Sequence, residues 1–311
     1  MRFAVAGAGA VGAYLGGRLA LAGHDVALLA RGPHLAAMVD RGLRITSPDG
    51  DFEAHPAVAA DPEAIGPADV VVLGVKAHSL PHLAPRLGPL FHCDTIVMST
   101  QNGIPWWLTP LERVDPGGVI AGAIEARRVV GSIIYFSAEV PEPGVIRHIE
   151  GSRMSLGEPS GGRSERCRIT AAALREAGLR CSVTAHLREE VFVKLMGNAA
   201  FNPISALTGA TLAEMAQHPE VSSLARKIMA EVDAVATGLG MRLPVSIERR
   251  MAGVEEVGHH KTSMLQDLEA GRPLELEAVV GAVVELGGRL GIEMPHTAAV
   301  YACTKLRADC R

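Results

Sequence analysis

Two polar side chains, Lys194 and Asn198, interrupt the almost wholly apolar stretch Val191–Phe201, and Asn202 follows it directly. The spacing is i, i+4, i+8, so on an α-helix the three side chains lie one above another on a single stripe. A buried lysine ammonium without a partner is costly or loses its proton, so its presence here indicates a site that needs it for chemistry. The alternative is a lysine that reaches the surface from a helix edge, with the asparagines packed against a neighbouring turn.

The bulk composition is that of a globular protein with two domains. The chain has 311 residues, more than the roughly 250 at which single cores stop growing. Its net charge of −4 and the absence of a long basic run argue against binding to nucleic acid or a membrane surface. Five cysteines form no CxxC pair, and the glycine-rich N-terminal stretch is interpreted as structure and not as a signal peptide. We therefore expect a cytoplasmic protein.

Short apolar runs alternate with helical patterns in the first part of the chain, which is typical of a parallel sheet. We predict strands at 3–6, 25–30, 70–75, 95–99, 119–123, 131–137, 144–148, 154–156 and 180–184, with helices at 10–22 and 163–177. After about residue 187 only helices are predicted, at 188–202, 212–239, 244–260, 264–270, 275–290 and, briefly, after Pro295. The predicted fold class is α/β: an N-terminal Rossmann doubly wound parallel sheet over residues 1–185 and a C-terminal all-helical domain over residues 186–311.

The turn after the first predicted strand has the pattern GxGxxG, which opens the first predicted helix. The first glycine permits a tight turn, the second lets the backbone approach a pyrophosphate, and the third allows close helix–strand packing. The N–H groups at the start of the helix are then available to the phosphates. We expect six residues to bind a dinucleotide: Gly7, Ala8, Gly9, Ala10, Val11 and Gly12.

Arg31 follows the second predicted strand, where NAD sites usually carry Asp or Glu to hold the ribose 2′-hydroxyl. An arginine there can pair with a 2′-phosphate and stack on adenine, so the expected cofactor is NADP, bound as NADPH. The alternative is a surface arginine in a turn.

Lys76 and Asn102 follow two later strands, at the edge of the sheet that faces a bound cofactor. Each side chain can hydrogen-bond the nicotinamide ribose or a substrate oxygen. The alternatives are a solvated charge for Lys76 and a turn residue for Asn102, which precedes a glycine.

A last group of polar residues lies in the helical part. Ser263 and Gln266 have the spacing of a capping box, and Glu275 is favoured by the dipole of the helix that it begins. Both positions therefore have explanations without chemistry. The neighbouring His259 and His260 lack a cysteine or an HExxH pattern beside them, so we expect no metal site.

Taken in order, GAGAVG, Arg31, GVKA, QNG, KLMGNAAFNPISAL and SMLQDLEAGRPLE resemble the ketopantoate reductase (2-dehydropantoate 2-reductase) family over nearly the whole chain. The resemblance implies a Rossmann domain followed by a helical domain. It also implies NADPH-dependent reduction of a small 2-oxo acid, most directly 2-dehydropantoate to pantoate in pantothenate biosynthesis. A homodimer is compatible with the sequence but is not required by it.

The resemblance further implies a role for each matched residue. Lys194 matches a general acid that protonates the forming alkoxide, and Glu275 matches an acid beside the lysine and the cofactor ribose. The remaining matches bind or orient the ligands: Asn198, Asn202 and Ser263 the substrate, Lys76 the cofactor, and Asn102 both.

The chain departs from the family pattern beside the expected site. Trp106 and Trp107 follow the Asn-Gly pair, Ala121–Glu125 replaces a run of small and hydroxyl residues, and residues 208–212 lack a further asparagine. These departures leave the identity of the oxo acid open. Two other functions stay open with it: a related two-domain dehydrogenase for another hydroxy or oxo acid, and a non-catalytic NADP-binding module that senses redox state.

Overall fold

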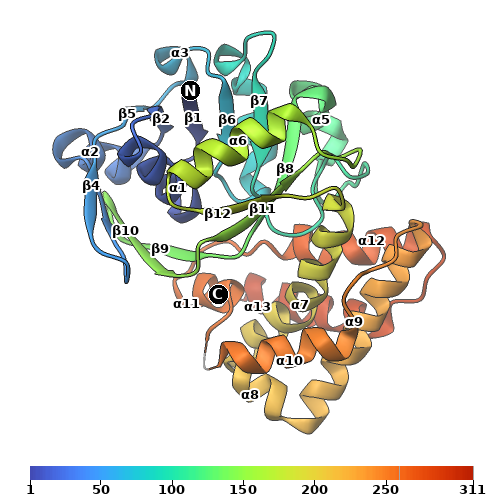
Figure 1. Ribbon diagram of the computed structural model, residues 1–311. Coiled ribbons are helices and arrows are strands. Elements are labelled where there is room, and N and C mark those ends of the chain that lie inside the picture. The colour runs from blue at the N-terminus through green and yellow to red at the C-terminus, as the bar shows by residue number, and fades with distance from the viewer. Residues whose placement is uncertain (259, 311) are drawn as a thin grey trace. The chain divides into compact units, whose positions relative to one another are not determined.

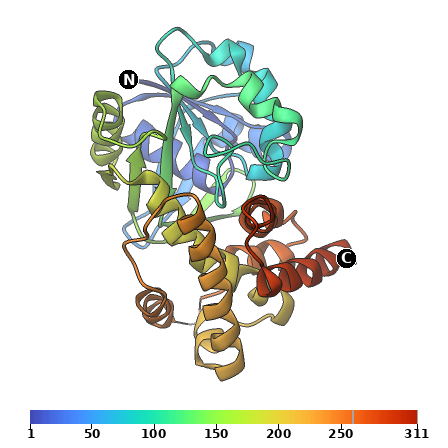
Figure 2. The ribbon, with the colours of Figure 1, turned by 90° about the vertical axis from the view of Figure 1, so that its right-hand side faces the viewer.

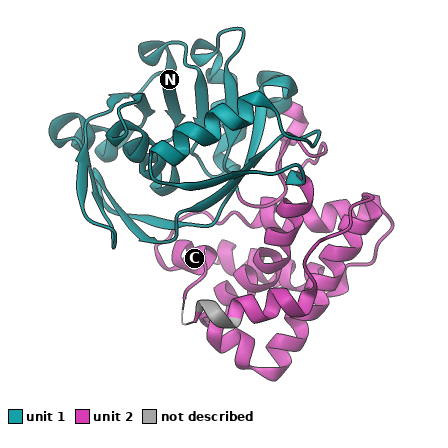
Figure 3. Ribbon diagram, in the orientation of Figure 1, with its two compact units in different colours: residues 1–101, 119–187 teal, residues 102–118, 188–311 magenta. Residues whose placement is uncertain are grey.

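The structure is a computed structural model that describes residues 1–258 and 260–310, apart from the side chains of residues 255–257. His259, one of the two neighbouring histidines named in the sequence analysis, lies outside the described residues. The chain divides into two compact units (Figure 3). Met1–Gln101 and Val119–Leu187 form the first, called the sheet unit; Asn102–Gly118 and Arg188–Arg311 form the second, called the helical unit.

The described part of the sheet unit is built on an eight-stranded, mostly parallel sheet with the order β12-β11-β8-β7-β6-β1-β2-β5 (Figure 1). The order reverses around β1, and ligands of open α/β sheets bind outside the carboxyl ends of the strands at such a point. The strands are β1 (Arg2–Ala6), β2 (Asp25–Leu29), β5 (Ala57–Ala59), β6 (Val70–Leu73), β7 (Ile96–Ser99), β8 (Val129–Ile134), β11 (Arg153–Gly157) and β12 (Arg180–Val183).

Helices cover both faces of this sheet. Helices α1 (Ala10–Leu21) and α6 (Glu165–Glu176) lie on one face, and α4 (Leu80–Leu83) and α5 (Val119–Ala123) lie on the other (Figures 1 and 2). This is the doubly wound α/β arrangement, and the predicted fold class is confirmed. The remaining helical segments of the unit are the ten-residue helix α2 (Gly32–Arg41), the single turn α3 (Pro62–Ile65), and the 3₁₀ turns η1 (Ala77–Ser79), η2 (Ala84–Arg86), η3 (Gly88–Leu90) and η5 (Ala126–Arg128).

Helix α1 is covered on its other side by a second sheet, which the sequence analysis did not predict as a separate layer. Its order is β4-β3-β10-β9. The two layers explain the glycines of α1. A Cβ on Gly16 would lie 2.6 Å from Leu28 of the large sheet, and one on Gly17 would overlap Ile45 of the small sheet. The strands of the small sheet are β3 (Leu43–Thr46), β4 (Phe52–Ala54), β9 (Ser137–Glu142) and β10 (Val145–Glu150).

One predicted strand was wrong, and four observed strands, β3, β4, β5 and β9, were not predicted. Residues 119–123 form α5, because the parallel strands β7 and β8 need a crossover, and a short apolar run does not by itself distinguish a buried strand from a buried helix. Residues between the strands predicted at 131–137 and 144–148 form β9 (Ser137–Glu142), which contains Pro141. This strand is the edge of the small sheet, where a proline can be accommodated.

The described helical unit contains no strand. The helix predicted over 212–239 is interrupted at His218, which is extended, and Pro219 occupies the first turn of the next helix. No described helix is long and apolar enough to cross a membrane. The helical elements are α7 (Leu187–Thr208), α8 (Leu212–Gln217), α9 (Pro219–Gly238), α10 (Ile247–Val257), α11 (Ser263–Glu269), the π-helical turn η6 (Glu277–Gly281), α12 (Ala282–Arg289), α13 (Pro295–Asp309) and the 3₁₀ turn η4 (Pro116–Gly118).

Glu231 of α9 ties two helices of this unit together. Its buried carboxylate accepts hydrogen bonds from the backbone N–H groups of His296 (3.0 Å) and Thr297 (2.8 Å), which begin α13. It therefore supplies acceptors that the first turn of α13 lacks. Burial alone would raise the pKa of Glu231, but the hydrogen bonds outweigh it, and the net shift is downward.

We expect Glu231→Gln to lower the free energy of unfolding at pH 7 by about 1–3 kcal/mol, because a charged acceptor is lost from a buried helix terminus. Since the folded-state pKa is depressed, this contribution is present above the unfolded pKa and is lost as the pH falls through the folded pKa. Urea unfolding at pH 7 and at successively lower pH measures it, with the exposed Glu220→Gln on the same helix as the control. An unchanged stability at pH 7 would contradict this account.

Candidate active site

The turn between β1 and α1 packs against the turn that follows β6, both within the sheet unit. Gly7 has a φ of +110°, and a Cβ there would overlap Val75. A Cβ on Gly12 or on Gly74 would overlap the carbonyl oxygen of Gly7. Three backbone segments therefore approach one another as closely as only glycine allows, and they form a cradle without side chains.

The cradle meets the requirements of a dinucleotide phosphate site. Gly9 is the N-cap residue of α1. The first main-chain hydrogen bond of the helix runs from the N–H of Ala13 to the carbonyl oxygen of Gly9. The N–H groups of Ala10, Val11 and Gly12 thus have no acceptor within the helix, as at any helix N-terminus. Ala8, by contrast, donates its N–H to Leu29 of β2, which fixes the turn on the sheet. The residues present fit a bound pyrophosphate.

Arg31 and Lys76 lie at the carboxyl ends of the strands that flank β1. Arg31 is exposed, follows β2 and is the N-cap residue of α2. Lys76 follows β6, and its Nζ atom is buried. Gln101, which follows β7, donates from Nε2 to the carbonyl oxygens of Leu73 (2.7 Å) and Val75 (2.9 Å) and so holds the turn before Lys76 in place.

In the helical unit, Lys194, Asn198 and Asn202 all lie on α7, as predicted from their spacing. Lys194 and Asn198 are half-buried, and Asn202 is buried. The other faces of the helix are buried too. The side chains concerned are Val191, Phe192, Leu195, Met196, Ala199, Ala200 and Phe201.

Lys194 is held by the side chain of Asn102, which the sequence places 92 positions away. Lys194 Nζ donates to Asn102 Oδ1 at 2.7 Å, and Asn102 Nδ2 donates to Glu275 Oε2 at 3.3 Å. The amide therefore turns its acceptor to the cation and its donor to the carboxylate. Lys194, Asn102 and Glu275 form a polar triad within the helical unit, which we call the lysine triad.

The surroundings of Lys194 make it a better acid. Burial, the largest effect, lowers its pKa to about 8, the Glu275 carboxylate opposes that shift, and the Arg250 guanidinium adds to it. A proton donor is most effective when its pKa lies near the working pH. The triad can therefore deliver a proton and, before it does so, stabilise a developing negative charge.

Three contributors to these sites were not singled out from the sequence. Gly74 completes the cradle, but the sequence analysis names it only within the motif GVKA and gives it no role. Gly197 and Arg250 belong together, because a Cβ on Gly197 would overlap the Arg250 guanidinium. A glycine inside a long helix is unfavourable and indicates a close approach, but nothing in the sequence names the side chain that makes it.

The alternative explanation of Ser263, as the first residue of a capping box, was wrong. Thr262 is the N-cap residue of α11, and its hydroxyl accepts from Leu265 N–H, whereas Gln266 donates to Lys261 O. Ser263 is the exposed first residue of the helix. Its role in substrate binding, like those of Asn198 and Asn202, stays a prediction.

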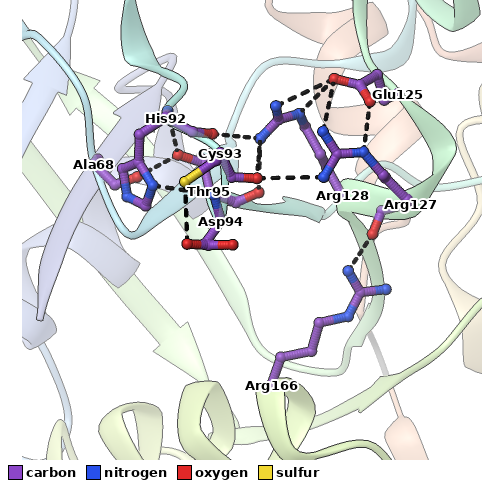
Figure 4. Close-up of polar contacts among 9 residues, drawn as sticks. All are labelled: Ala68, His92, Cys93, Asp94, Thr95, Glu125, Arg127, Arg128 and Arg166. Atoms are coloured by element: carbon purple, nitrogen blue, oxygen red, sulfur yellow. Dashed lines mark hydrogen bonds and ion pairs between the residues drawn. The ribbon is translucent and has the colours of Figure 1, made fainter.

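The residues that depart from the family pattern have distinct surroundings. Trp106 is buried, with 5% of its surface exposed, and Trp107 is half-buried. Glu125 lies in the sheet unit and pairs with Arg127 and Arg128 (Figure 4).

One group of described residues has the side-chain types of a metal site: His92, Cys93 and Asp94, in the turn before β7. These side chains already bond to their own turn, since Cys93 Sγ donates to Asp94 and Asp94 N–H donates to His92. Arg128 also binds the carbonyl oxygens of His92 and Cys93 and brings a positive charge to the turn (Figure 4). We interpret these contacts as a braced turn, and the expectation of no metal stays a prediction.

Comparison with known proteins places both units in one family. Residues 3–161 match the family described as "Ketopantoate reductase PanE/ApbA", and residues 186–308 match "Ketopantoate reductase PanE/ApbA C terminal". The chain therefore belongs to the ketopantoate reductase family and is an oxidoreductase of the NAD(P)-dependent kind, as the sequence analysis predicted.

Individual relatives agree with this assignment. A 2-dehydropantoate 2-reductase of Mesorhizobium japonicum is 46% identical, over 98% of this chain and 97% of that protein. The crystal structure of 2-dehydropantoate 2-reductase from Geobacter metallireducens has a TM-score of 0.89 and 30% identity, covering 98% of this chain and 99% of that one. D-mandelate dehydrogenase, solved with NADH and anilino(oxo)acetate, has a TM-score of 0.90 over 100% and 99% of the two chains; at 21% identity it shows the fold alone.

The contact between Arg250 and α7 yields a prediction about Lys194. Because the guanidinium is a like charge that lowers the pKa of Lys194, we expect Arg250→Met to raise that pKa. The alkaline limb of the pH–activity profile should then move to higher pH. The control is Arg249→Met, which removes the neighbouring exposed charge on the same helix. A limb that stays in place, or moves equally in both variants, would refute the electrostatic role of Arg250.

Proposed function

We propose that the protein reduces 2-dehydropantoate (ketopantoate) to pantoate with NADPH, a step of pantothenate biosynthesis. The single observation that carries the proposal is the lysine triad, in which Lys194 has a pKa of about 8 and is bonded to Asn102 beside Glu275. Relatives that carry the name 2-dehydropantoate 2-reductase, one of them 46% identical, support the choice of substrate.

The roles of the triad follow from the charge that develops on the substrate. When bound, NADPH supplies the hydride that is added to C2 of the oxo acid. The carbonyl oxygen of the acid then takes up negative charge, and Lys194 stabilises it and transfers the Nζ proton to it. Asn102 keeps the ammonium oriented, and Glu275 favours its charged form until that transfer.

The remaining site residues would bind and orient the ligands. Asn198 and Asn202 share the stripe of Lys194, and their amides can donate to the carboxylate and hydroxyl oxygens of the acid. Ser263 offers a further donor. In this proposal residues 1–185 are the NADP-binding domain, apart from Asn102–Gly118, which belongs to the helical unit, and residues 186–311 are the catalytic domain. The protein works in the cytoplasm on a small 2-oxo acid.

The cradle of Gly7, Gly12 and Gly74 would hold the pyrophosphate, together with the N–H groups at the start of α1. Arg31, exposed at the end of β2, would bind the 2′-phosphate, and Lys76 would bind the nicotinamide ribose. This arrangement favours NADPH over NADH.

The first test follows NADPH oxidation with ketopantoate and a panel of branched and aromatic 2-oxo acids. We expect ketopantoate to have the highest kcat/KM, and Lys194→Met to lower kcat by about 10²-fold or more with NADPH affinity unchanged. Lys227→Met, an exposed lysine of α9, is the control. No turnover of any 2-oxo acid by a protein that binds NADPH would refute the proposal and favour a redox sensor.

The same panel tests the second candidate, a related dehydrogenase for a different hydroxy or oxo acid. The observation behind it is the Trp106–Trp107 pair, which follows Asn102 in the helical unit and departs from the family pattern. A bulky aromatic oxo acid with a higher kcat/KM than ketopantoate would decide for that candidate.

A separate experiment tests the cofactor. We expect Arg31→Ala to weaken NADPH binding about tenfold to a hundredfold, because hydrogen bonds to charged groups contribute about 1.5–3 kcal/mol, and to leave NADH binding unchanged. Calorimetric titration of both cofactors measures this, with the exposed Arg41→Ala at the other end of α2 as the control. An equal loss for both cofactors would remove Arg31 from 2′-phosphate recognition.

A further inference from the structure

The segment Asn102–Gly118, called the strap here, begins with a member of the lysine triad and belongs to the helical unit by its contacts. Two residues after Asn102, the N–H of Ile104 donates to the carbonyl oxygen of Ala278 in the π-helical turn η6 at 2.9 Å. Gly103 lies between them with a φ of +89°, and a Cβ there would overlap Ala278 O. The strap is therefore in direct backbone contact with the turn that follows Glu275.

A second attachment lies ten residues along the strap. The carboxylate of Glu285 on α12 accepts the N–H groups of Glu112 (3.0 Å) and Arg113 (3.1 Å). Arg289, one turn further on α12, bonds to Glu285 at 2.5 Å and also reaches the carbonyl oxygen of Pro110. Backbone groups of the strap are thus held by both charges of an ion pair on one helix.

A third attachment uses the side chain of Arg113. Its Nη1 donates to Glu277 Oε2 at 2.7 Å, and the guanidinium lies over the Tyr301 ring, 5.0 Å from its centre. A Cβ on Gly281 would lie 2.9 Å from Arg113 Cδ and 2.7 Å from the Glu277 carboxylate. The space for this pair therefore depends on a glycine within the π-helical turn.

All three attachments end on the stretch that runs from η6 into α12, and Glu275 lies two residues before the first residue of that stretch, Glu277. Asn102 and Glu275 are thus carried by two segments that are fixed to each other. π-Helical turns are rare and are frequently found at functional sites. Here the turn directs Ala278 O to the strap.

We propose that Arg113, through Glu277, and Glu285 are positioning residues that hold the strap on η6 and α12 and so keep Asn102 bonded to both Lys194 and Glu275. The inference rests on the proposed function for its kinetic consequence only. It gives a positioning role to Arg113, Glu277 and Glu285, which touch none of the three triad side chains in the contacts given above.

The expected effect follows from what faces Lys194: Asn102 on the strap, Glu275 before η6 and Arg250 on α10. With one attachment removed and two remaining, we expect a small shift of the strap that lengthens the bond from Lys194 to Asn102 but keeps Lys194 buried and leaves Arg250 in place. The charged form of Lys194 is then less favoured, so its pKa falls and the alkaline limb of activity moves to lower pH. This direction is opposite to the one expected for Arg250→Met.

The test compares Arg113→Met with Lys305→Met. Both remove one cation from Glu277, but Lys305 lies on α13 and has no bond to the strap. We expect Arg113→Met to lower kcat about tenfold, as small misplacements of catalytic groups do, with a small change in KM and no change in NADPH affinity. Arg113→Lys should restore part of kcat, and Lys305→Met should behave as the wild type.

A readout without turnover separates this inference from the proposed function. The chain has five lysines, so ¹³C-labelled lysine signals can be assigned to Lys194 and titrated by NMR. A lower Lys194 pKa in Arg113→Met, and in Glu285→Gln as a milder second variant, supports positioning even if the wild type reduces no oxo acid. An unchanged Lys194 pKa in both variants, or an equal shift in Lys305→Met, overturns it.

Discussion

A lysine ammonium set among apolar side chains of α7 imposes a requirement on the rest of the helical unit. Its charge needs an acceptor and a counter-charge, and the structure supplies them from two other segments, Asn102 and Glu275. Burial lowers the pKa of Lys194 to about 8, and Glu275 limits that shift, so the group remains cationic at neutral pH but releases its proton readily. The chemistry of the site depends on this balance.

The sheet unit builds its site from backbone groups, whereas the helical unit builds its site from side chains. In the sheet unit, glycines bring three backbone segments together, so that main-chain N–H groups and a helix N-terminus can face phosphates. In the helical unit, side chains do the work, and their positions depend on the surrounding helices. Asn102 lies on the strap and not on a helix, and ion pairs and backbone hydrogen bonds hold the strap in position.

Much of this arrangement follows from the sequence, because periodic patterns and short motifs depend on interactions between residues that are close together in the chain. The i, i+4, i+8 spacing placed Lys194, Asn198 and Asn202 on one helix, and GxGxxG after a strand predicted the cradle turn. What could not be predicted depends on tertiary contacts. The helix at 119–123 is set by the crossover between parallel strands, and the approach of Arg250 to Gly197 joins two residues that are 53 positions apart in the chain. The bond between Asn102 and Lys194 likewise has no local signal, and only the family resemblance suggested that the two act together.

The central claim is that Lys194 is an ammonium whose pKa its surroundings bring near the working pH. The most direct measurement is a pH titration of the ¹³C-labelled Lys194 side chain of the wild-type protein by NMR, with the exposed Lys227 as an internal reference. The account predicts a midpoint of about 8 for Lys194, well below that of Lys227. A midpoint for Lys194 equal to that of Lys227 would contradict it.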